Sequence, residues 1–437
     1  MKVLLTHTLG LTLLAPALVL ALPPYPNVTI PSGLSLSEIE ATAATTLPES
    51  PVSNVKKNTN FEDAAADENM QWLASQGILL TNYFGVTHPS QPNYCASVGG
   101  DTWGMDHDSL IDMPANISTI VDLLDTKDIS WGEYQEHLPY AGFQGLNYSN
   151  QATLRDDYAC RHNPIINFRS VTNNETRARR IKSFTDFQDD LANKLLPQWA
   201  FIKPNVTNDA HDTNITFGAK WERSWMSNLF KDPYFMNNTL VLLTFDEDAY
   251  LENNRVFSVL VGGAVQDHLK GTKDGTFYTH YSSIATVSAN WGLLSLGRWD
   301  CGANIFEIVS NKTGYVNYEV DTTHLLLNQT YPGPSAIGWI RQYSPVWPIP
   351  TTDAQCSAGQ GVLDSVKSLY GSLSPTYNYT SPYPVDASSY NMNVTGVRTS
   401  NTTTGASMTA VSAGTAVTAP GFVIITLAFG GYLFCLV

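Results

Sequence analysis

Short apolar runs alternate with amphipathic segments along most of the chain. Runs with few polar residues, as in strands buried on both faces, lie at 77–84, 129–134, 198–202, 239–245 and 256–261. Segments with helical spacing or composition lie at 62–75, 117–124, 184–195 and 221–230. Strands that alternate with helices and lack a polar face are typical of parallel sheets covered on both sides. The pattern predicts an α/β fold with a mainly parallel central sheet and helices on both faces.

Both ends of the chain have the pattern of processing signals. Met1 and Lys2 precede an apolar run that ends in small residues, which predicts a secretory signal peptide over 1–21. Residues 421–437 are apolar to the end and have no basic flank, as in the signal for a glycosylphosphatidylinositol (GPI) lipid anchor. A C-terminal membrane helix is the less favoured alternative, because the tail is short for a span.

Composition divides the remaining chain into three parts. Residues 22–57 are rich in Pro, Ser and Thr without an apolar period, and we interpret them as a loose N-terminal arm. The globular pattern covers 58–381. Residues 382–420 are interpreted as a Ser/Thr-rich glycosylated stalk that carries the anchor attachment site, and the tail 421–437 is expected to be removed.

Charge and glycosylation signals fit a secreted protein. The formal net charge is −15 and charged residues make up only 14%, which disfavours nucleic-acid binding and suits a protein that works in acid. Acceptor sites for N-linked glycans occur at Asn27, Asn116, Asn147, Asn174, Asn205, Asn214, Asn237, Asn311, Asn328, Asn378, Asn393 and Asn401.

The chain has five cysteines, of which Cys435 would leave with the tail. The other four allow two disulfides in any of three pairings, which stay open: Cys95, Cys160, Cys301 and Cys356.

Polar residues follow the predicted strands at the points where these end. His88 and Ser90 follow the first strand. Asp209, His211 and Asp212 follow the third strand, and Asp246, Glu247 and Asp248 follow the fourth. His280 comes later in the chain. The carboxyl ends of parallel strands meet at one edge of a sheet, where ligands of such folds bind. A single acidic pair would be interpreted as a helix cap, but three clusters beside a serine favour a functional site.

Ser90 lies in the stretch 87–94, between an apolar strand and a segment of small residues. By itself, Pro-Ser-Gln-Pro is more often a rigid turn than a nucleophile. A serine at a helix start nevertheless lies where backbone N–H groups favour an anion, and nearby carboxylates would hold a divalent metal that activates it. The chain has no Gly-x-Ser-x-Gly segment, which disfavours an α/β-hydrolase esterase.

Seven longer stretches share their residues and order with a known family. They are THPSQPNYCASVGGD (87–101), WGEYQEHLPYAGFQG (131–145), RHNP (161–164), PNVTNDAHDT (204–213), LLTFDED (242–248), NRVFSVLVGG (254–263) and THYSSIATVSANWGLLSLGRWD (279–300). Over about residues 58 to 350 the chain resembles the fungal secreted acid phosphatases of the phosphoesterase family, related to phospholipase C within the alkaline-phosphatase-like superfamily. The resemblance implies a phosphoesterase catalytic domain over 58–381.

The resemblance also implies roles for individual residues. Its catalytic set is Ser90 as nucleophile, Asn93 as a donor to a phosphate oxygen, His211 and His280. Its substrate- and phosphate-binding set is His88, Arg161, His162, Asp209 and Asp212. Its metal set, for a divalent ion of unknown identity, is Asn58, Ser90, Asp246 and Glu247.

One departure from the family lies just before the globular region. The family opens with an apolar strand that ends in Glu-Asn-Thr, whereas this chain has Lys57 before Asn58 and no apolar run over 47–56. A cation replaces a metal-binding anion, and the first strand of the sheet is missing from the sequence. Either the chain is an inactive relative or the sequence lacks a short segment near Lys57, and the local extent of the loss favours the second.

We therefore predict a secreted, glycosylated acid phosphatase, GPI-anchored to the plasma membrane or cell wall. It would hydrolyse phosphate monoesters of small substrates through a phosphoserine on Ser90. A phosphodiesterase of the phospholipase C kind, and an inactive cell-wall glycoprotein with Lys57 in place of the metal ligand, are the alternatives.

Overall fold

The computed structural model describes residues 59–249, 253–322, 325, 327, 330–337, 343–356 and 359–377, with the backbone of 398–399, 423–428 and 435–436. The predicted signal peptide, the arm with Lys57, and Asn58 lie outside these residues. All described residues belong to one compact unit, Ser35–Val437. No helix among the described residues is long and apolar enough to cross a membrane.

A nine-stranded sheet forms the centre of this unit. Its strands run in the order β10 (Thr272–Asp274), β1 (Ile78–Leu80), β9 (Ser258–Val261), β8 (Thr239–Thr244), β14 (Val423–Ala428), β7 (Trp199–Lys203), β3 (Trp131–Gln135) and β6 (Ile181–Ser183), and β15 (Cys435–Leu436) pairs with β7 and β8. The sheet is parallel from β8 to β6. The parallel prediction is wrong for β9, which runs antiparallel to β1 and β8.

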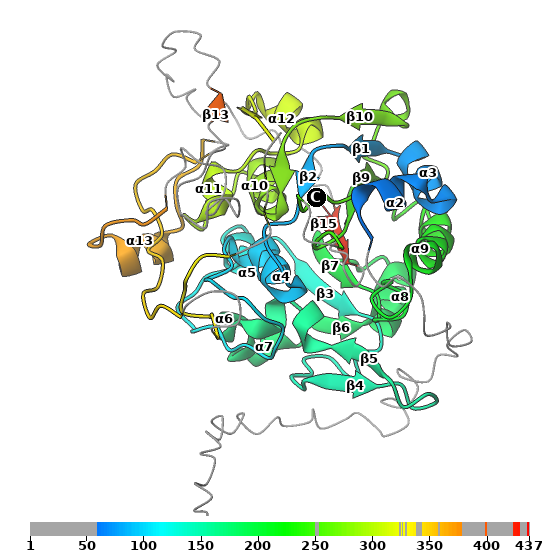
Figure 1. The fold of residues 1–437 in the computed structure, drawn as a ribbon, viewed down its shortest axis with the longest axis horizontal. Coiled ribbons are helices and arrows are strands. Elements are labelled where there is room, and N and C mark those ends of the chain that lie inside the picture. Colours follow the sequence, from blue (N-terminus) through cyan, green and yellow to red (C-terminus); the bar gives the residue numbers. More distant parts are fainter. Residues whose placement is uncertain are drawn as a thin grey trace, which may run out of the picture. The chain divides into compact units, whose positions relative to one another are not determined.

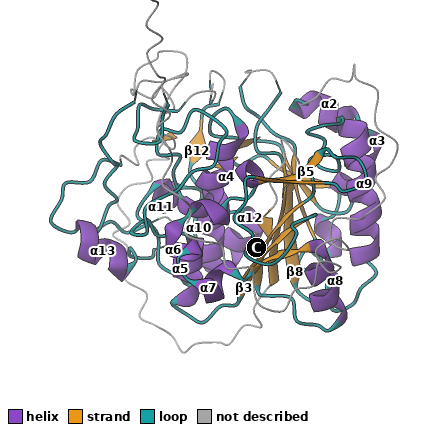
Figure 2. Ribbon diagram, turned by 90° about the horizontal axis from the view of Figure 1, so that it is seen from below, coloured by secondary structure: helices purple, strands orange, loops and turns teal. Residues whose placement is uncertain are grey.

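Helices cover both faces of the sheet, as predicted (Figure 2). On one side lie α3 (Glu68–Ser75), α8 (Phe184–Ala192) and α9 (Ile215–Leu229), and on the other α4 (Ser90–Gly99), α5 (Ile120–Asp125) and α10 (His280–Trp291). Burial on both faces explains why β7 and β8 are buried at every position.

The remaining elements are short and lie mostly in the connections. They are α2 (Phe61–Ala66), β2 (Tyr83–Phe84), β4 (Asn147–Ser149), β5 (Asp156–Ala159), η1 (Cys160–His162), η2 (Ile165–Asn167), α6 (Arg169–Thr172), α7 (Glu175–Ala178), η3 (Asp267–Leu269), β11 (Tyr278–Thr279), α11 (Trp299–Gly302), α12 (Glu307–Thr313), β12 (Glu319–Val320), α13 (Asp364–Tyr370) and β13 (Arg398–Thr399).

Capping side chains explain where two predicted helices differ from the observed ones. The predicted helix 62–75 is two helices, because the Asp67 carboxylate accepts hydrogen bonds from the backbone N–H groups of Asn69 and Met70 and starts α3. The predicted helix 221–230 begins earlier, at Ile215, where the Asn214 side chain accepts from the Phe217 N–H.

The strand between β7 and β8 comes from the far end of the chain. The sequence lacks the first strand of the sheet, and in the structure β14 pairs with both β7 and β8. The red strand segments near β7 in Figure 1 belong to the C-terminal end of the chain. β14 belongs to the tail that we predict to be removed in exchange for a lipid anchor. A removed segment cannot be a strand of the mature protein, so the two uses exclude each other and the anchor stays a prediction.

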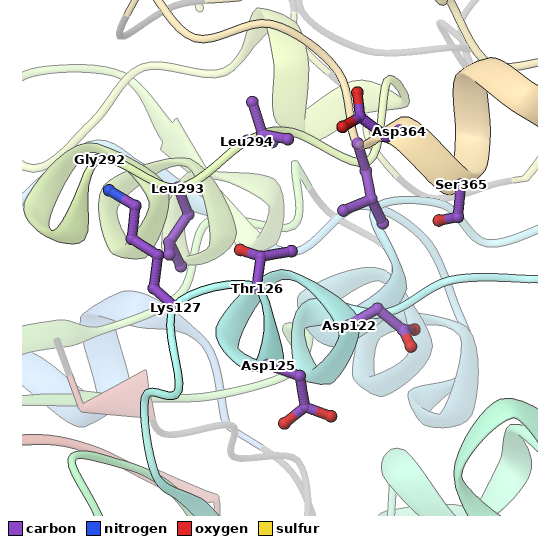
Figure 3. A pocket seen from close by; sticks show the side chains of 10 residues that line it. Asp122, Asp125, Thr126, Lys127, Gly292, Leu293, Leu294, Asp364 and Ser365 are labelled. Atoms are coloured by element: carbon purple, nitrogen blue, oxygen red, sulfur yellow. The ribbon is translucent and has the colours of Figure 1, made fainter.

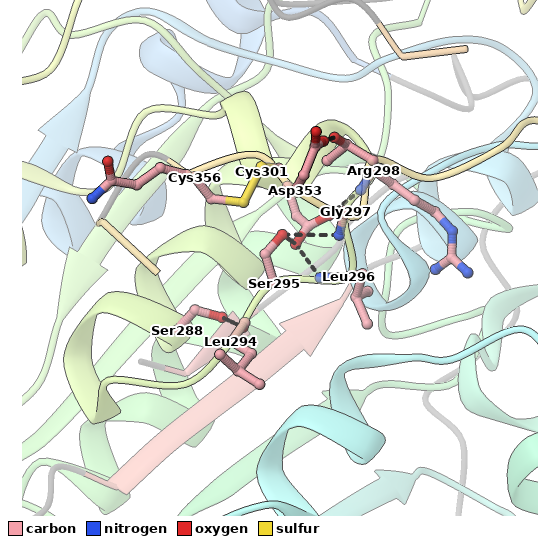
Figure 4. The surroundings of a disulfide bond; sticks show 12 residues. Ser288, Leu294, Ser295, Leu296, Gly297, Arg298, Cys301, Asp353 and Cys356 are labelled. Carbon is pink, nitrogen blue, oxygen red and sulfur yellow. Dashed lines mark hydrogen bonds between the residues drawn. A yellow bond between two sulfur atoms is a disulfide. The ribbon is translucent and has the colours of Figure 1, made fainter. Parts of the chain in front are cut away.

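Of the three possible cysteine pairings, only the one that joins Cys301 to Cys356 agrees with the structure, which forms that bond (Figure 4). The partners that would form the second disulfide, Cys95 and Cys160, are buried free thiols, and burial raises the pKa of Cys160 to about 12. Next to the bond, the Asp300 carboxylate accepts from the Ser295 hydroxyl at 2.6 Å and from the Leu296 N–H at 2.9 Å. The disulfide thus ties this hydrogen-bonded turn to the segment before α13.

Candidate active site

Ser90 is the first residue of α4 and follows the loop that leaves β2, as the sequence predicts. Asn93 holds this loop in place. Its Oδ1 accepts from the Val86 N–H at 2.8 Å and the Thr87 N–H at 3.2 Å, and its Nδ2 donates to the Thr87 carbonyl at 2.8 Å. Asn93 therefore fixes the position of Ser90, and its contact with a phosphate oxygen stays a prediction.

Two carboxylates from the loop after β8 lie beside the serine. The Ser90 hydroxyl donates to Glu247 Oε1 at 3.0 Å. Asp246 Oδ2 and Glu247 Oε2 are buried without a hydrogen-bond partner among the described residues. Burial raises the pKa of Asp246 to about 8, and burial together with the Asp246 charge raises the pKa of Glu247. A hydroxyl next to two buried carboxylates with unpaired oxygens is a suitable environment for a cation.

The two histidines nearest this acidic loop contact its backbone. His88 Nε2 lies 3.0 Å from the Asp248 carbonyl oxygen, and His88 Nδ1 is buried without a described partner. His280 begins α10, and its Nε2–H donates to the Asp246 carbonyl oxygen at 2.6 Å, while Nδ1 lies 3.2 Å from the Tyr83 hydroxyl. Burial lowers the pKa of His280 to about 4. His280 thus supports the acidic loop as a neutral ring, and its catalytic role stays a prediction.

A second cluster forms where β7 ends. Lys203 is buried and forms an ion pair with Asp209, and its Nζ also donates to the Pro204 carbonyl oxygen at 3.1 Å. His162 Nδ1 lies 3.6 Å from Asp209 Oδ2. The His162 ring stacks on Tyr94 with centroids 5.3 Å apart and meets His211 edge-on at 5.2 Å.

His162 is the least satisfied polar side chain of this cluster. Both of its ring nitrogens are buried without a hydrogen-bond partner among the described residues. Burial, followed by the charge of Lys203, lowers its pKa well below the ordinary value. A neutral imidazole with two unpaired nitrogens is costly unless something polar binds there.

The remaining predicted residues lie at the outer side of this cluster. The His211 backbone N–H donates to Asp209 Oδ1 at 2.8 Å, and its Nδ1 lies 2.8 Å from Asp212 Oδ1. The His211 and Asp212 side chains are 28% and 40% exposed, so substrate could reach them from solvent. Arg161, next to His162 in η1, is partly exposed.

Helix α4 links the two clusters, because Ser90 and Tyr94 are one turn apart on it. The structure thus brings together the predicted residues that it describes, from Ser90 and Glu247 on one side to Asp209 and His162 on the other.

Sequence reasoning missed several supporting residues. Lys203 closes the apolar run Trp-Ala-Phe-Ile, and a lysine at the end of a buried strand was the available signal. Asp108, whose Oδ1 accepts from the Gln91 N–H at 2.9 Å, and Glu136, whose Oε2 accepts from the Asn205 N–H at 2.8 Å, gave no local signal. Asn205, a predicted glycan acceptor, is buried.

Two hollows among the described residues lie away from these clusters. One, of about 640 Å³, lies beside α5 and includes Asp122, Lys127 and Asp364 (Figure 3). The other, of about 660 Å³, includes Lys273 and Glu307. Neither hollow is lined by a predicted site residue.

Comparison with known proteins identifies the family. The model of the Phosphoesterase family matches residues 58–294. An acid phosphatase of Aspergillus fumigatus is 66% identical over 378 residues, which are 83% of this chain and 85% of the relative. The chain belongs to the Phosphoesterase family. The resemblance stated from the sequence motifs is thereby confirmed.

More distant relatives are named for related activities. A phosphate-repressible acid phosphatase of Penicillium chrysogenum is 57% identical, covering 81% of this chain and 88% of the relative. A phosphatidylinositol-3-phosphatase of Mycobacterium tuberculosis is 28% identical, covering 52% and 70%. A solved alkaline phosphatase superfamily structure from Vibrio parahaemolyticus, with TM-score 0.32 and 10% identity, covers 58% of this chain and 73% of its own; it is too dissimilar to carry an argument.

Proposed function

We propose that this phosphoesterase is a secreted acid phosphatase that hydrolyses phosphate monoesters of small substrates through Ser90. The observation that carries the proposal is the Ser90 hydroxyl at the start of α4, hydrogen-bonded to Glu247 within a buried pair of carboxylates. The names of the fungal relatives support the acid phosphatase activity. The start of helix α4 favours an anionic substrate at this position.

In the proposed reaction the Ser90 oxygen attacks phosphorus, and its proton leaves along the hydrogen bond to Glu247. The bond from phosphorus to the alcohol oxygen breaks, and the leaving oxygen takes a proton from an imidazole, for which His211 is the more exposed candidate. Water then attacks the phosphoserine, and inorganic phosphate leaves. Asn93 holds the loop before Ser90 through the Val86 N–H, and His280 holds the loop after β8 through the Asp246 carbonyl oxygen.

A divalent metal ion is part of the proposal, with Ser90, Asp246 and Glu247 as ligands. The unpaired buried oxygens of the two carboxylates fit such an ion. Within the described residues no group of three or more His, Cys, Asp or Glu side chains is arranged to hold a metal, so the proposal needs a further ligand such as Asn58. When bound, the ion would lower the serine pKa and neutralise phosphoryl oxygens.

Among the alternatives, a phosphomonoesterase is favoured over a phosphodiesterase. Even the distant mycobacterial relative is named as a phosphatase, although its substrate is a lipid. Secretion and N-linked glycans remain part of the proposal on the strength of the signal-peptide pattern and the acceptor sites. The inactive alternative depends on Lys57 and is tested by the same experiment.

The experiment compares the full chain with Ser90→Ala and with Ser97→Ala, a control on the same helix whose hydroxyl donates only to the local Tyr94 carbonyl. Activity is measured at acid pH on an aryl phosphate monoester and the matching diester. We expect Ser90→Ala to lose activity by at least ~100-fold and Ser97→Ala to retain most of it. Substantial activity in Ser90→Ala, or a faster reaction on the diester, would overturn the proposal, and no activity in the unaltered chain would favour the inactive alternative.

A further inference from the structure

The turn after β3 is tied to the loop after β7 by several hydrogen bonds. The Glu136 N–H donates to the Lys203 carbonyl oxygen at 2.9 Å. The Glu136 carboxylate accepts from the Asn205 N–H at 2.8 Å and from Nδ2 of Asn208 at 2.9 Å. β3 and β7 are neighbours in the sheet, so these bonds continue their pairing beyond the strand ends. We call residues 204–213, which carry part of the second cluster, the anchored loop.

A buried pair of a histidine and an aspartate lies against the same loop. His137 Nδ1 lies 2.7 Å from Asp157 Oδ2 and 3.1 Å from Asn205 Nδ2. Both side chains of the pair are almost completely buried. The Asp157 carbonyl oxygen also accepts from the Val206 N–H at 3.0 Å. Asp157 is thus connected to the anchored loop twice, once through its backbone and once through His137.

This pair joins the two segments that form the second cluster of the site. Asp157 lies in β5, which leads directly into η1 with His162. On the other segment, the Asp209 N–H donates to the Asn205 carbonyl oxygen at 2.9 Å, so the position of Asp209 follows that of Asn205. The contact between His137 and Asp157 therefore helps to set the 3.6 Å between Asp209 Oδ2 and His162 Nδ1.

The charges around His137 favour its protonated form. Burial opposes a positive charge, but the hydrogen bond to Asp157 and the charges of Glu136 and Asp157 outweigh it and raise the pKa of His137 above the ordinary 6.5. Lys203, whose charge also acts on Glu136, is paired with Asp209. If His137 lost its proton, Asp157 would be left buried without this cation, and its Oδ1 has no hydrogen-bond partner among the described residues.

We propose that His137 is a positioning residue of the candidate active site, which holds the anchored loop, and with it Asp209, against His162 as long as its ring is protonated and bound to Asp157. This role rests on the proposed function, because it concerns the second cluster of the same site. By proton linkage, the contribution of a group with a raised pKa is fully present below pH 6.5 and is lost as the pH rises through the pKa of His137 in the folded protein.

The first test needs no enzymatic activity. Amide hydrogen exchange over 204–213 is measured at pH 5 and pH 9 in the unaltered protein and in His137→Asn, and is expressed as protection factors, which remove the intrinsic effect of pH on exchange. We expect the protection of the anchored loop to fall at least ~10-fold between the two pH values in the unaltered protein and to be low and nearly constant in His137→Asn. Full protection at pH 9 in the unaltered protein, or the same fall in His137→Asn, would overturn this role of His137.

The second test measures catalysis. Asparagine suits the backbone at this position, where φ is 62°, and its amide can still donate to Asp157 but does not titrate. His268→Asn, at an exposed histidine, is the control. The ratio kcat/KM for an aryl phosphate monoester is followed from pH 5 to pH 9. We expect His137→Asn to lose ~10-fold at pH 5 and little at pH 9, where the unaltered protein has lost the same charge, and His268→Asn to match the unaltered protein throughout.

The possible outcomes separate this role from the proposed function. An unchanged kcat/KM in His137→Asn, or a loss of the same size at pH 5 and pH 9, would show that the protonated ring does not position the loop, and would leave the role of Ser90 intact. An unaltered chain without phosphatase activity would contradict the proposed function, and the exchange measurement would still decide whether His137 holds the anchored loop.

Discussion

The pH dependence of stability can be predicted from one buried carboxyl group, that of Glu133 in β3. Its side chain is fully buried, Oε1 accepts a hydrogen bond from the Gln135 amide, and Oε2 has no partner among the described residues. Burial raises the pKa of Glu133 from 4.5 to about 8. The folded protein therefore binds this proton more tightly than the unfolded chain does.

The sign follows from proton linkage. A carboxyl group with a raised pKa in the folded state contributes stability that is fully present below about pH 4.5 and is lost as the pH rises towards 8. The rise of the Glu133 pKa from 4.5 to about 8 corresponds to a ceiling of ~5 kcal/mol, of which ~3–4 kcal/mol is lost between pH 5 and pH 8. Partial hydration of the ionised group lowers this figure.

The substitution Glu133→Gln removes the titration and keeps the shape of the side chain. We expect the free energy of unfolding of Glu133→Gln to fall less steeply between pH 5 and pH 8 than that of the unaltered protein, by up to ~3 kcal/mol. Urea unfolding at pH 5, 6, 7 and 8 measures this slope. Glu175→Gln is the control, because the Glu175 side chain is 80% exposed, and its slope should not change. Equal slopes for Glu133→Gln and the unaltered protein would refute the reasoning.

Three further predictions concern the site and the disulfide. A chelator should abolish activity on a phosphate monoester, and added divalent ions should restore it. Asp246→Asn should weaken the response to added metal, and activity that survives exhaustive chelation contradicts the metal proposal. Lys203→Met should lower the free energy of unfolding in urea by ~3–5 kcal/mol, because the Asp209 charge is left buried without its cation. Asp209→Asn in the same chain should recover part of the lost stability. Replacing both Cys301 and Cys356 by Ala should cost up to ~4 kcal/mol, as the bond closes a loop of 55 residues; unchanged stability would show that the bond does not form.

The sequence predicted the layers of the fold better than its connections. Periodicity located β3, β7 and β8 within one or two residues, because strands buried on both faces have an unmistakable apolar run. It did not show that β9 is antiparallel, since the direction of a strand depends on the path of the loop before it. Nor could it place β14, because the run 423–428 suits a removable tail and a central strand equally well.

The ends of the predicted strands showed where the site residues lie better than what each residue does. Ser90 and Glu247 meet as the pattern implies, since both follow strands that point to one edge of the sheet. His280 contacts the backbone of Asp246, which depends on a helix entering from 34 residues away and cannot be inferred from spacing. Lys203 ends a buried strand, but its ion pair with Asp209 depends on the path of the loop after that strand and could not be inferred from the sequence.

Buried acids give a physical reason why this fold suits acid conditions. Burial raises the pKa of carboxyl groups in several parts of the molecule, among them Glu133 in the sheet, Glu222 in α9 and Asp246 at the site. Each such group favours the folded state at low pH by the same linkage that applies to Glu133. Acid also reduces the net charge of −15 and thus the repulsion within the compact state. Stability is therefore expected to increase towards acid pH, through groups that lie both inside and outside the site.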